Sequence, residues 1–283
     1  MEVEFKSVEK FFRRPGQSGD RRIQALSPTS FVIESGEFYS IIGPSGCGKS
    51  TLLNLLAGLE IPDSGEVRVD GERVTKPGPD RAVVFQEPGL MPWMTISGNI
   101  EYGLKLKGVP AAERRDRAQH FLRMVHLSKF AQAMPHQLSG GMRQRVSIAR
   151  ALALEPRVLL MDEPFSALDA QTRDVLHDEL QRIWQETRTT ILFVTHNLTE
   201  AVYLSDQVLI MTAPPGSIKR IVRVPFSRPR VKNSTELTMF INELHDDIKS
   251  EVELVAAREL DPDWQPEKAI RVEDGTVTYG EGI

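Results

Sequence analysis

The chain has 283 residues, of which 40% are hydrophobic and 26% are charged, and its formal net charge is −4. This composition is typical of a soluble globular protein with one sizeable core, and the length favours one main domain with a small appendage. No stretch approaches the roughly 18 consecutive apolar residues of a membrane span, the first residues lack a secretory signal, and the net charge gives no indication of nucleic-acid binding. The only cysteine, Cys47, excludes an intramolecular disulfide, so we expect a cytoplasmic protein.

Short apolar runs of strand length alternate with longer helical patterns along the chain. These runs are Phe38 to Ile42, Ala82 to Phe85, Val158 to Met161, Thr190 to Val194 and Gln207 to Met211. Such alternation predicts an α/β fold with a largely parallel sheet that is buried on both faces.

Two regions depart from this alternation. Asp70-Gly71 is a hairpin turn pair between Glu66 to Val69 and Glu72 to Val74, which predicts an antiparallel element that precedes or flanks the parallel core. From Gly98 to Glu155 the pattern is almost wholly helical. We therefore predict a helical subdomain, about residues 87 to 156, inserted into a main domain of residues 1 to 225.

The C-terminal extension, residues 226 to 283, follows the proline-containing segment PFSRPR. Asn233, with Glu236 three residues later, indicates a helix start, and apolar residues then recur at helical spacing. We predict an amphipathic helix over about residues 234 to 258 and a hairpin at Asp274-Gly275. Such a helix usually packs on its own domain, and a regulatory or dimer-contact role is the alternative.

The stretch GPSGCGKST matches the pattern GxxxxGK followed by Ser or Thr, between an apolar strand and a helical run. Its glycines let backbone N–H groups turn toward an anion, and the helix N-terminus adds its positive dipole end. Lys49 is suited to reach terminal phosphates, and Ser50 is suited to ligate Mg²⁺. A chance glycine-rich turn would rarely have both flanks. We predict a nucleotide site formed by Gly43, Pro44, Ser45, Gly46, Cys47, Gly48, Lys49, Ser50 and Thr51.

Two acidic residues, Asp162 and Glu163, follow the apolar run Val158 to Met161, at the edge where open α/β sheets bind ligands. Asp162 is a candidate Mg²⁺ ligand, and Glu163 is a candidate to orient or deprotonate an attacking water. The alternative is that both acids only cap the segment that begins at Pro164. The phosphate loop favours the functional interpretation.

A third motif, LSGGM at residues 138 to 142, opens a helical run. Ser139 and the amides of Gly140 and Gly141 can hold a second anion, although a plain helix N-cap explains the same residues equally well.

The three motifs, in this order and separated by a helical insert, resemble the nucleotide-binding ATPase subunits of ABC transporters over about residues 1 to 225. The resemblance identifies Gln86 with the glutamine loop, residues 166–169 with a segment that crosses the dimer interface, and His196 with the switch histidine. Phe12 lies where the family has an aromatic side chain that stacks on adenine, although Phe11 or Phe12 can equally be a buried strand residue. The sequence departs from the family at Met142, where glutamine is commoner, and in having Phe instead of Tyr as the stacking residue.

The resemblance implies ATP and Mg²⁺ as cofactors and a head-to-tail homodimer. The phosphate loop of one subunit and residues 139–141 of the other would sandwich ATP. It implies catalytic roles for Glu163, His196, Lys49 and Gln86. It implies that Mg²⁺ is held by Ser50, Gln86 and Asp162.

The segment at residues 77 to 100 narrows the resemblance to the ATPases of nitrate, sulfonate and taurine importers. Its apolar residues Leu90, Met91, Trp93 and Met94 suit a groove that receives a short helix from a membrane subunit, unless they are core of the helical subdomain. The resemblance therefore implies transmembrane permease subunits as partners, a periplasmic or extracellular solute-binding protein as an indirect partner, and a place on the cytoplasmic face of the membrane.

Rival classes fit the sequence less well. Soluble ABC proteins of translation or DNA maintenance, which have no membrane partner, usually carry two cassettes or a long coiled-coil insertion, and this chain has one cassette and no heptads. A non-hydrolysing scaffold is disfavoured by the intact candidate residues of the site. Guanine specificity is disfavoured because no asparagine is followed by lysine, so the NKxD motif is absent.

Overall fold

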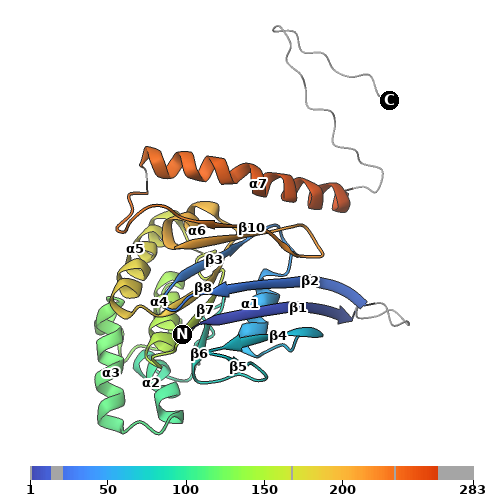
Figure 1. Cartoon of the computed structure of the whole chain (residues 1–283). Helices are drawn as coiled ribbons and strands as arrows, with labels where there is room; N and C mark the ends of the chain where they lie inside the picture. Colours follow the sequence, from blue (N-terminus) through green and yellow to red (C-terminus); the bar gives the residue numbers. More distant parts are fainter. Residues whose placement is uncertain (1, 14–21, 167, 233, 261–283) are drawn as a thin grey trace, which may run out of the picture.

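The computed structural model describes residues 2–13, 22–166, 168–232 and 234–260 (Figure 1). The described residues form a six-stranded sheet and a four-stranded sheet, with helices around them.

The six-stranded sheet has the order β10-β9-β3-β8-β7-β6. Its strands are β3 Phe38–Ile42, β6 Arg81–Val84, β7 Val158–Asp162, β8 Thr190–Val194, β9 Gln207–Met211 and β10 Ile218–Arg223. The five strands that the apolar runs predicted pair in parallel, whereas β10 pairs antiparallel with β9 at the edge. Continuous apolar runs are the expected composition of parallel strands because both sheet faces are covered.

The four-stranded sheet is antiparallel and has the order β2-β1-β4-β5. Its strands are β1 Val3–Arg13, β2 Arg22–Ile33, β4 Ser64–Val69 and β5 Glu72–Arg73. The sequence predicted the β4-β5 hairpin but not β1 and β2. Register shifts interrupt β1 between Phe5 and Val8 and again before Lys10, and such bulges break the period-two alternation that identifies a strand.

Helices surround the parallel sheet. They are α1 Lys49–Ala57, α2 Ile96–Leu106, α3 Ala111–Met124, α4 Gly140–Leu152, α5 Ala170–Thr187 and α6 Leu198–Leu204, with short 3-10 helices at Ser128–Phe130 and Pro135–Gln137. Helices α2, α3 and α4 pack on one another between β6 and β7 in the chain, and they form the green region of Figure 1.

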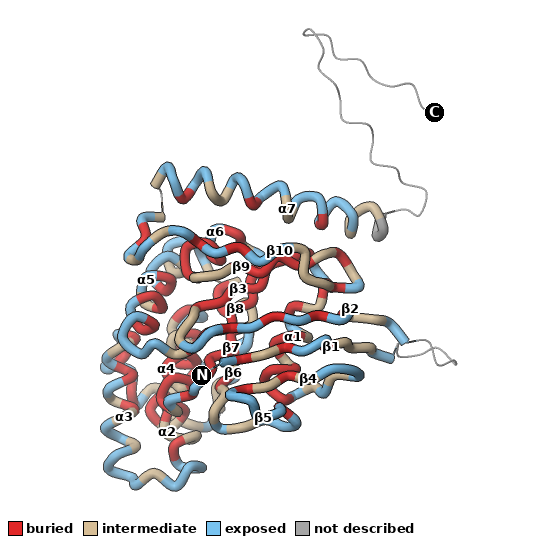
Figure 2. The backbone as a smooth tube through the Cα atoms, in the orientation of Figure 1, coloured by how far each residue is buried: buried red, intermediate tan, exposed pale blue. Residues whose placement is uncertain are grey.

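Two apolar cores lie on opposite faces of the parallel sheet, and β3 contributes to both. Tyr39 and Ile41 belong to the core shared with α1 and the antiparallel sheet, whereas Phe38 and Ile42 belong to the core shared with α4, α5 and α6. Because side chains alternate along a strand, one buried strand supports both layers. Figure 2 shows these buried segments through the middle of the molecule.

Between β10 and helix α7 the chain is held to the parallel-sheet layer. Arg228 binds Asp206 and donates to Leu204 O, and the buried Arg230 donates to carbonyl oxygens of Val202, Tyr203 and Ser205. Burial, with the charge of Arg228, lowers the pKa of Arg230 to about 10.

Helix α7, Thr235–Leu260, lies along α6 and β10 on the outside of the molecule (Figure 1). Its side chains Leu237 and Leu244 are buried in the core that contains α6, with Phe240, Ile241 and Ile248 packed against it. The prediction placed this helix at about residues 234 to 258. Asn233 and the expected hairpin at Asp274-Gly275 lie outside the described residues, and the division into domains at residue 225 stays a prediction. Within the described parts of the chain, no helix combines the length and hydropathy needed to cross a bilayer.

Candidate active site

The phosphate loop connects β3 to α1, and its backbone requires glycine. Gly46 and Gly48 have φ angles of 75° and 91°, in the left-handed region that glycine adopts without steric cost. A Cβ atom on Gly48 would also lie 2.5 Å from Leu26 Cδ2 and 3.0 Å from Ala25 O. The loop therefore lies directly against β2 and presents the first turn of α1 to an anion.

Lys49 is 7% exposed and lies inside the curve of this loop. Its Nζ donates to Gly43 O at 2.9 Å and to Pro44 O at 2.8 Å. Both acceptors are neutral carbonyl groups, so the ammonium keeps a net positive charge that can attract phosphate oxygens.

Asp162 ends β7 beside the first turn of α1. Ser50 Oγ donates to Asp162 Oδ1 at 3.1 Å. Burial raises the pKa of Asp162, as does the charge of Glu163, while the hydrogen bond from Ser50 and the charge of Lys49 lower it. A hydroxyl and a carboxylate side by side fit Mg²⁺, which is usually held by one or two carboxylates with water and substrate phosphates. Among the described residues no cluster of three or more His, Cys, Asp and Glu side chains suggests a full protein cage for a metal.

Glu163 follows Asp162 in an unusual backbone conformation. Its φ is 43°, which is uncommon for a residue with a side chain, and its N–H donates to Val194 O at 2.9 Å. Its Oε2 lies 3.2 Å from Nδ1 of the exposed His196, which follows β8. A carboxylate that is paired with an imidazole at a strand edge can orient or deprotonate a water molecule.

A cavity of about 370 Å³ lies beside this cluster. It is lined by Phe12, Ala25, Ser45, Gly46, Gly48, Lys49, Ser50, Thr51 and Glu163. Phe12 belongs to β1, is 38% exposed, and carries Lys10 Nζ over its ring at 5.3 Å. The interpretation of Phe12 as a buried strand residue is therefore wrong, because its side chain is exposed and lines this cavity.

Gln86 lies two residues after β6, at the same sheet edge as Asp162, because Val84 pairs with Met161 in parallel register. Its side chain is exposed and does not appear among the residues that line the phosphate cavity. Its predicted contact with Mg²⁺ stays a prediction. Helix α4 holds this segment, since Gln144 Nε2 donates to Phe85 O at 3.3 Å.

Residues 139–141, at the start of α4, do not line the phosphate cavity of the same chain. Ser139 is the N-cap and accepts the Met142 N–H at 3.3 Å, and Ser139 and Gly140 are exposed. Gly141 is buried, and a Cβ atom there would lie 2.6 Å from Thr172 Cγ2. The lining of the phosphate cavity, within the described residues, includes none of the three. Ser139 therefore acts as the N-cap of α4, which is one of the two interpretations of this motif. The binding of a second anion by residues 139–141 stays a prediction.

A buried network behind His196 was not recognised in the sequence. Glu200 accepts the Thr195 hydroxyl at 2.7 Å, and its oxygens lie 3.5 Å from Arg173 Nε and 3.4 Å from His177 Nε2. Burial acts to raise the pKa of Glu200, but contacts with His177, Thr195 and Arg173 lower it below the usual value. Asn197 caps α6 by accepting the Glu200 N–H at 3.2 Å. The spacing of Asn197 and Glu200 is that of a capping box, and this spacing is the feature of the sequence from which Glu200 could have been recognised.

An apolar hollow of about 350 Å³ lies beside the segment after Gln86. Its apolar lining includes Leu59, Phe85, Met91, Tyr102 and Leu154. Buried Asn99 fixes the neighbouring loop: its Oδ1 accepts the Met91 N–H at 2.7 Å, and its Nδ2 donates to Met91 O, Met94 O and Thr95 O. Trp93, on this loop, is 73% exposed. The interpretation of Trp93 as a core residue is therefore wrong.

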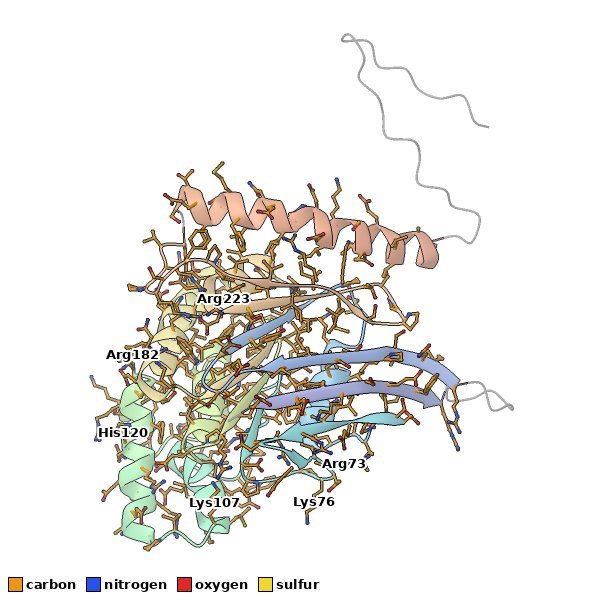
Figure 3. All side chains as sticks on the ribbon, viewed as in Figure 1. Arg73, Lys76, Lys107, His120, Arg182 and Arg223 are labelled. Carbon is orange, nitrogen blue, oxygen red and sulfur yellow. The ribbon has the colours of Figure 1, made fainter. Side chains whose placement is uncertain are left out.

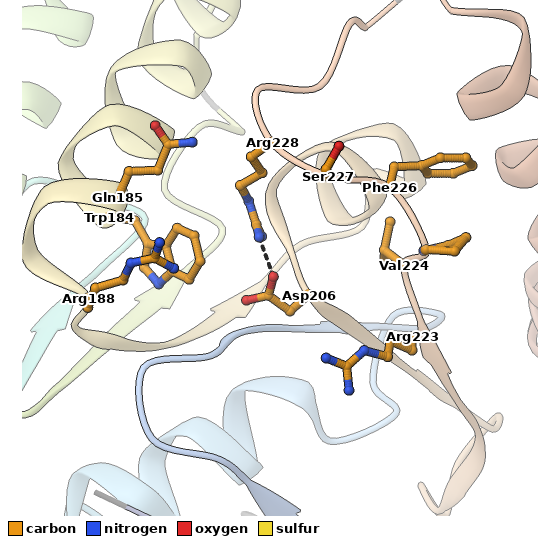
Figure 4. Close-up of a pocket in the computed structure, with 10 residues that line it drawn as sticks. Trp184, Gln185, Arg188, Asp206, Arg223, Val224, Phe226, Ser227 and Arg228 are labelled. Atoms are coloured by element: carbon orange, nitrogen blue, oxygen red, sulfur yellow. Dashed lines mark hydrogen bonds and ion pairs between the residues drawn. The ribbon is translucent and has the colours of Figure 1, made fainter.

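Two further hollows lie away from the motifs. One, of about 630 Å³, lies where α5 ends and is bordered by Trp184 (Figure 4). The guanidinium groups of Arg188 and Arg228 lie 4.8 Å and 4.2 Å from the centre of the Trp184 ring. The other, of about 860 Å³, includes Arg73, Lys76 and Lys107 in its lining; these three cations are labelled in Figure 3. Both mix charges of the two signs, as a solvated surface does.

Comparisons with known proteins agree with this site. The family model described as ABC transporter matches residues 26–166. An uncharacterized ABC transporter ATP-binding protein of Methanocaldococcus jannaschii is 48% identical over 252 residues, which are 89% of this chain and 93% of that protein. A nitrate import ATP-binding protein of Synechocystis is 47% identical over 83% of this chain and 88% of its own length. An aliphatic sulfonates import ATP-binding protein of Bacillus cereus is 45% identical, with 83% and 90% covered.

Solved structures confirm the predicted fold class. A dimeric post-hydrolysis state of an ATP-binding cassette bound to ADP and Pi aligns with a TM-score of 0.70 and 35% identity, covering 80% of this chain and 100% of the other. A second dimeric structure, of a bacterial ABC transporter cassette, aligns with the same TM-score and 34% identity. The fold that carries the phosphate loop, the acidic strand end and the α4 start is thus shared with these relatives. The chain belongs to the family of ABC transporter ATP-binding proteins, which are ATPases.

Proposed function

We propose that two copies of this chain bind and hydrolyse ATP with Mg²⁺ and thereby power the import of a small solute through a membrane permease. The observation that carries the hydrolytic part is the contact of 3.2 Å between Glu163 and His196 at the cavity that Lys49 lines. This arrangement joins a candidate base to a cationic phosphate site.

Each side chain has a distinct role in this proposal. The amides of residues 46–51 and Lys49 bind the phosphates, and Phe12, which also lines the cavity, stacks on the base. Ser50 and Asp162 would hold Mg²⁺, which supplies positive charge to the phosphates when it is bound. Glu163 accepts a proton from the attacking water, and His196 holds the carboxylate in place.

The dimer follows from the separation of the two phosphate-binding features. Ser139 and Gly140 are exposed at the start of α4, on a surface apart from the cavity of the same chain. In a head-to-tail homodimer this helix start faces the ATP held by the partner, and nucleotide then joins the subunits. The dimeric arrangement of the relative with ADP and Pi supports this step.

The permease would dock at the apolar hollow beside Trp93. Exposed Phe85 and Leu59 line this hollow together with Met91, and exposed Trp93 lies on the same loop as Met91; exposed apolar side chains of this kind can receive an amphipathic helix. Because Asn99 fixes the loop that carries Trp93, movement of the segment after Gln86 can pass to the docked helix. This subunit would then lie on the cytoplasmic face of the membrane.

The solute class rests on the relatives that are importers of nitrate and of aliphatic sulfonates. The test is co-expression with candidate permease and solute-binding subunits, followed by reconstitution in vesicles that contain ATP and Mg²⁺. We expect hydrolysis to rise when nitrate, a sulfonate or taurine is supplied with its binding protein. Hydrolysis that is unaffected by every permease, with no co-purifying membrane subunit, would support the alternative of a soluble ABC ATPase without a membrane partner.

A further inference from the structure

The segment between β9 and β10, residues 212–217, lies directly behind the phosphate loop. A Cβ atom on Gly216 would lie 1.8 Å from Cys47 O, and a Cβ atom on Gly43 would lie 3.0 Å from Met211 Cβ. The two backbones are thus in direct contact, so a shift of this segment must displace the phosphate loop or open a gap behind it.

Hydrogen bonds connect one side of this segment to β2. Gly216 N–H donates to Ala25 O at 3.0 Å, and Ser27 N–H donates to Gly216 O at 2.8 Å. Ala25 also borders the phosphate cavity. The segment therefore belongs to the wall that supports nucleotide.

Helix α7 holds the other side through Glu251, which is 8% exposed. Glu251 Oε2 accepts the Ala213 N–H at 2.8 Å, and Glu251 Oε1 lies 3.0 Å from Lys219 Nζ. Lys219 Nζ also donates to Asp247 O and Ser250 Oγ on α7, each at 2.8 Å. One buried carboxylate thus connects α7 both to the segment, at Ala213, and to the start of β10, at Lys219. Its loss removes the acceptor of the Ala213 N–H and the charge partner of Lys219.

We propose that Glu251 is a positioning residue for the nucleotide site. It presses the 212–217 segment against Cys47 of the phosphate loop, and in this way α7 sets the affinity for ATP. This inference rests on the proposed role of residues 43–51 in binding phosphates.

The test compares Glu251→Gln with Glu253→Gln, a charge-matched change at an exposed position two residues further along α7. We expect Glu251→Gln to raise the Kd for ATP about tenfold, while kcat at saturating ATP stays within about twofold. Glu253→Gln should leave Kd and kcat unchanged. Lys219→Met should raise the Kd in the same direction, and the double variant should add little to Glu251→Gln, because both remove one connection.

Cys47 supplies a second readout, since it is the only cysteine of the chain and is fully buried against the 212–217 segment. Labelling by a small thiol reagent, under conditions where all variants are folded, should be about tenfold faster in Glu251→Gln than in the wild type or Glu253→Gln. A lowered melting temperature with unchanged Kd and labelling rate would overturn the inference, because Glu251 would then only stabilise the fold.

Lys49→Ala separates this inference from the proposed phosphate site. If Lys49→Ala binds ATP normally, the phosphate-site assignment itself is wrong. If Lys49→Ala loses ATP while Glu251→Gln retains wild-type affinity, only the role of Glu251 is refuted.

Discussion

Two regions of the molecule carry the groups expected to surround ATP, and they differ in how they are held. At the carboxyl edge of the parallel sheet, hydrogen bonds within the subunit hold Lys49 to Gly43, Asp162 to Ser50 and Glu163 to Val194. At the start of α4, Ser139 accepts a hydrogen bond from its own helix and otherwise faces the exterior with Gly140.

One chain thus presents two kinds of site. The first region holds the groups proposed for hydrolysis in a geometry that is fixed inside the subunit. The second is an exposed helix N-terminus that does not line the cavity of its own subunit. Changes in the first region should affect chemistry or nucleotide binding within one subunit, whereas changes in the second should act once two subunits meet.

Glu163→Gln should produce the largest effect. The amide cannot accept a proton, so turnover should fall by about two to four orders of magnitude, while ATP binding is retained because the phosphate ligands remain. The variant should also accumulate as an ATP-bound dimer. A phosphate-release assay measures the turnover, and size measurement with ATP and Mg²⁺ detects the dimer. Near-normal turnover would show that Glu163 is not the proposed base.

Ser139→Arg tests the second region against the first. ATP binding to the monomer should persist, while hydrolysis should fall by about a hundredfold because the shared face is blocked and its donors are lost. Lys49→Ala, its counterpart in the first region, should weaken ATP binding itself. Calorimetry that found the same loss of binding in both variants would show that the two regions do not act separately.

Glu200→Gln tests the support behind His196 through pH. The folded-state pKa of Glu200 lies below its usual value near 4.5, so its contribution to stability is present above that pH and is lost as pH falls through the folded pKa. At pH 7 we expect the variant to be less stable by about 1 to 3 kcal/mol, and the difference should shrink in acid. Denaturant unfolding of the wild type and of the variant, at pH 7 and at an acidic pH, measures this difference in stability. A difference that does not change with pH would show that the charge of Glu200 is not the cause.

Trp93→Ala should have the smallest effect on the isolated subunit. Since the side chain is 73% exposed, the free energy of unfolding should change by no more than about 0.5 kcal/mol. Trp184→Ala, at a 3% exposed tryptophan, is the matched control and should cost about 3 to 5 kcal/mol. Trp93→Ala should nevertheless lose co-purification with the permease. Normal assembly of this variant would refute docking at Trp93.

The parts that could be predicted from sequence are those whose chemistry is local. Five continuous apolar runs identified the parallel strands, and the spacing of glycines and Lys49 identified the loop between β3 and α1. Asp162 and Glu163 were placed correctly at a strand end because apolar residues directly precede them.

The remainder depends on contacts between distant residues. The bulges of β1 hid a long strand. Strand β10 mixes basic and apolar residues without the continuous apolar run that identified the other strands of its sheet. Glu200 and Glu251 look like ordinary helical acids in the sequence. Their significance comes from Thr195, Arg173 and Lys219, which the fold brings to them from other elements.

The two arginines that follow β10 also complete helix α6. The last carbonyl groups of a helix have no intrahelical donor and are usually satisfied by water or by a following glycine. Here the carbonyl oxygens of Val202, Tyr203 and Ser205 accept from Arg230, and that of Leu204 accepts from Arg228. A chain cut after residue 225 would therefore lose the C-terminal cap of a seven-residue helix that begins two residues after His196. The part of the chain that completes the α6 end therefore extends beyond β10, to Arg230.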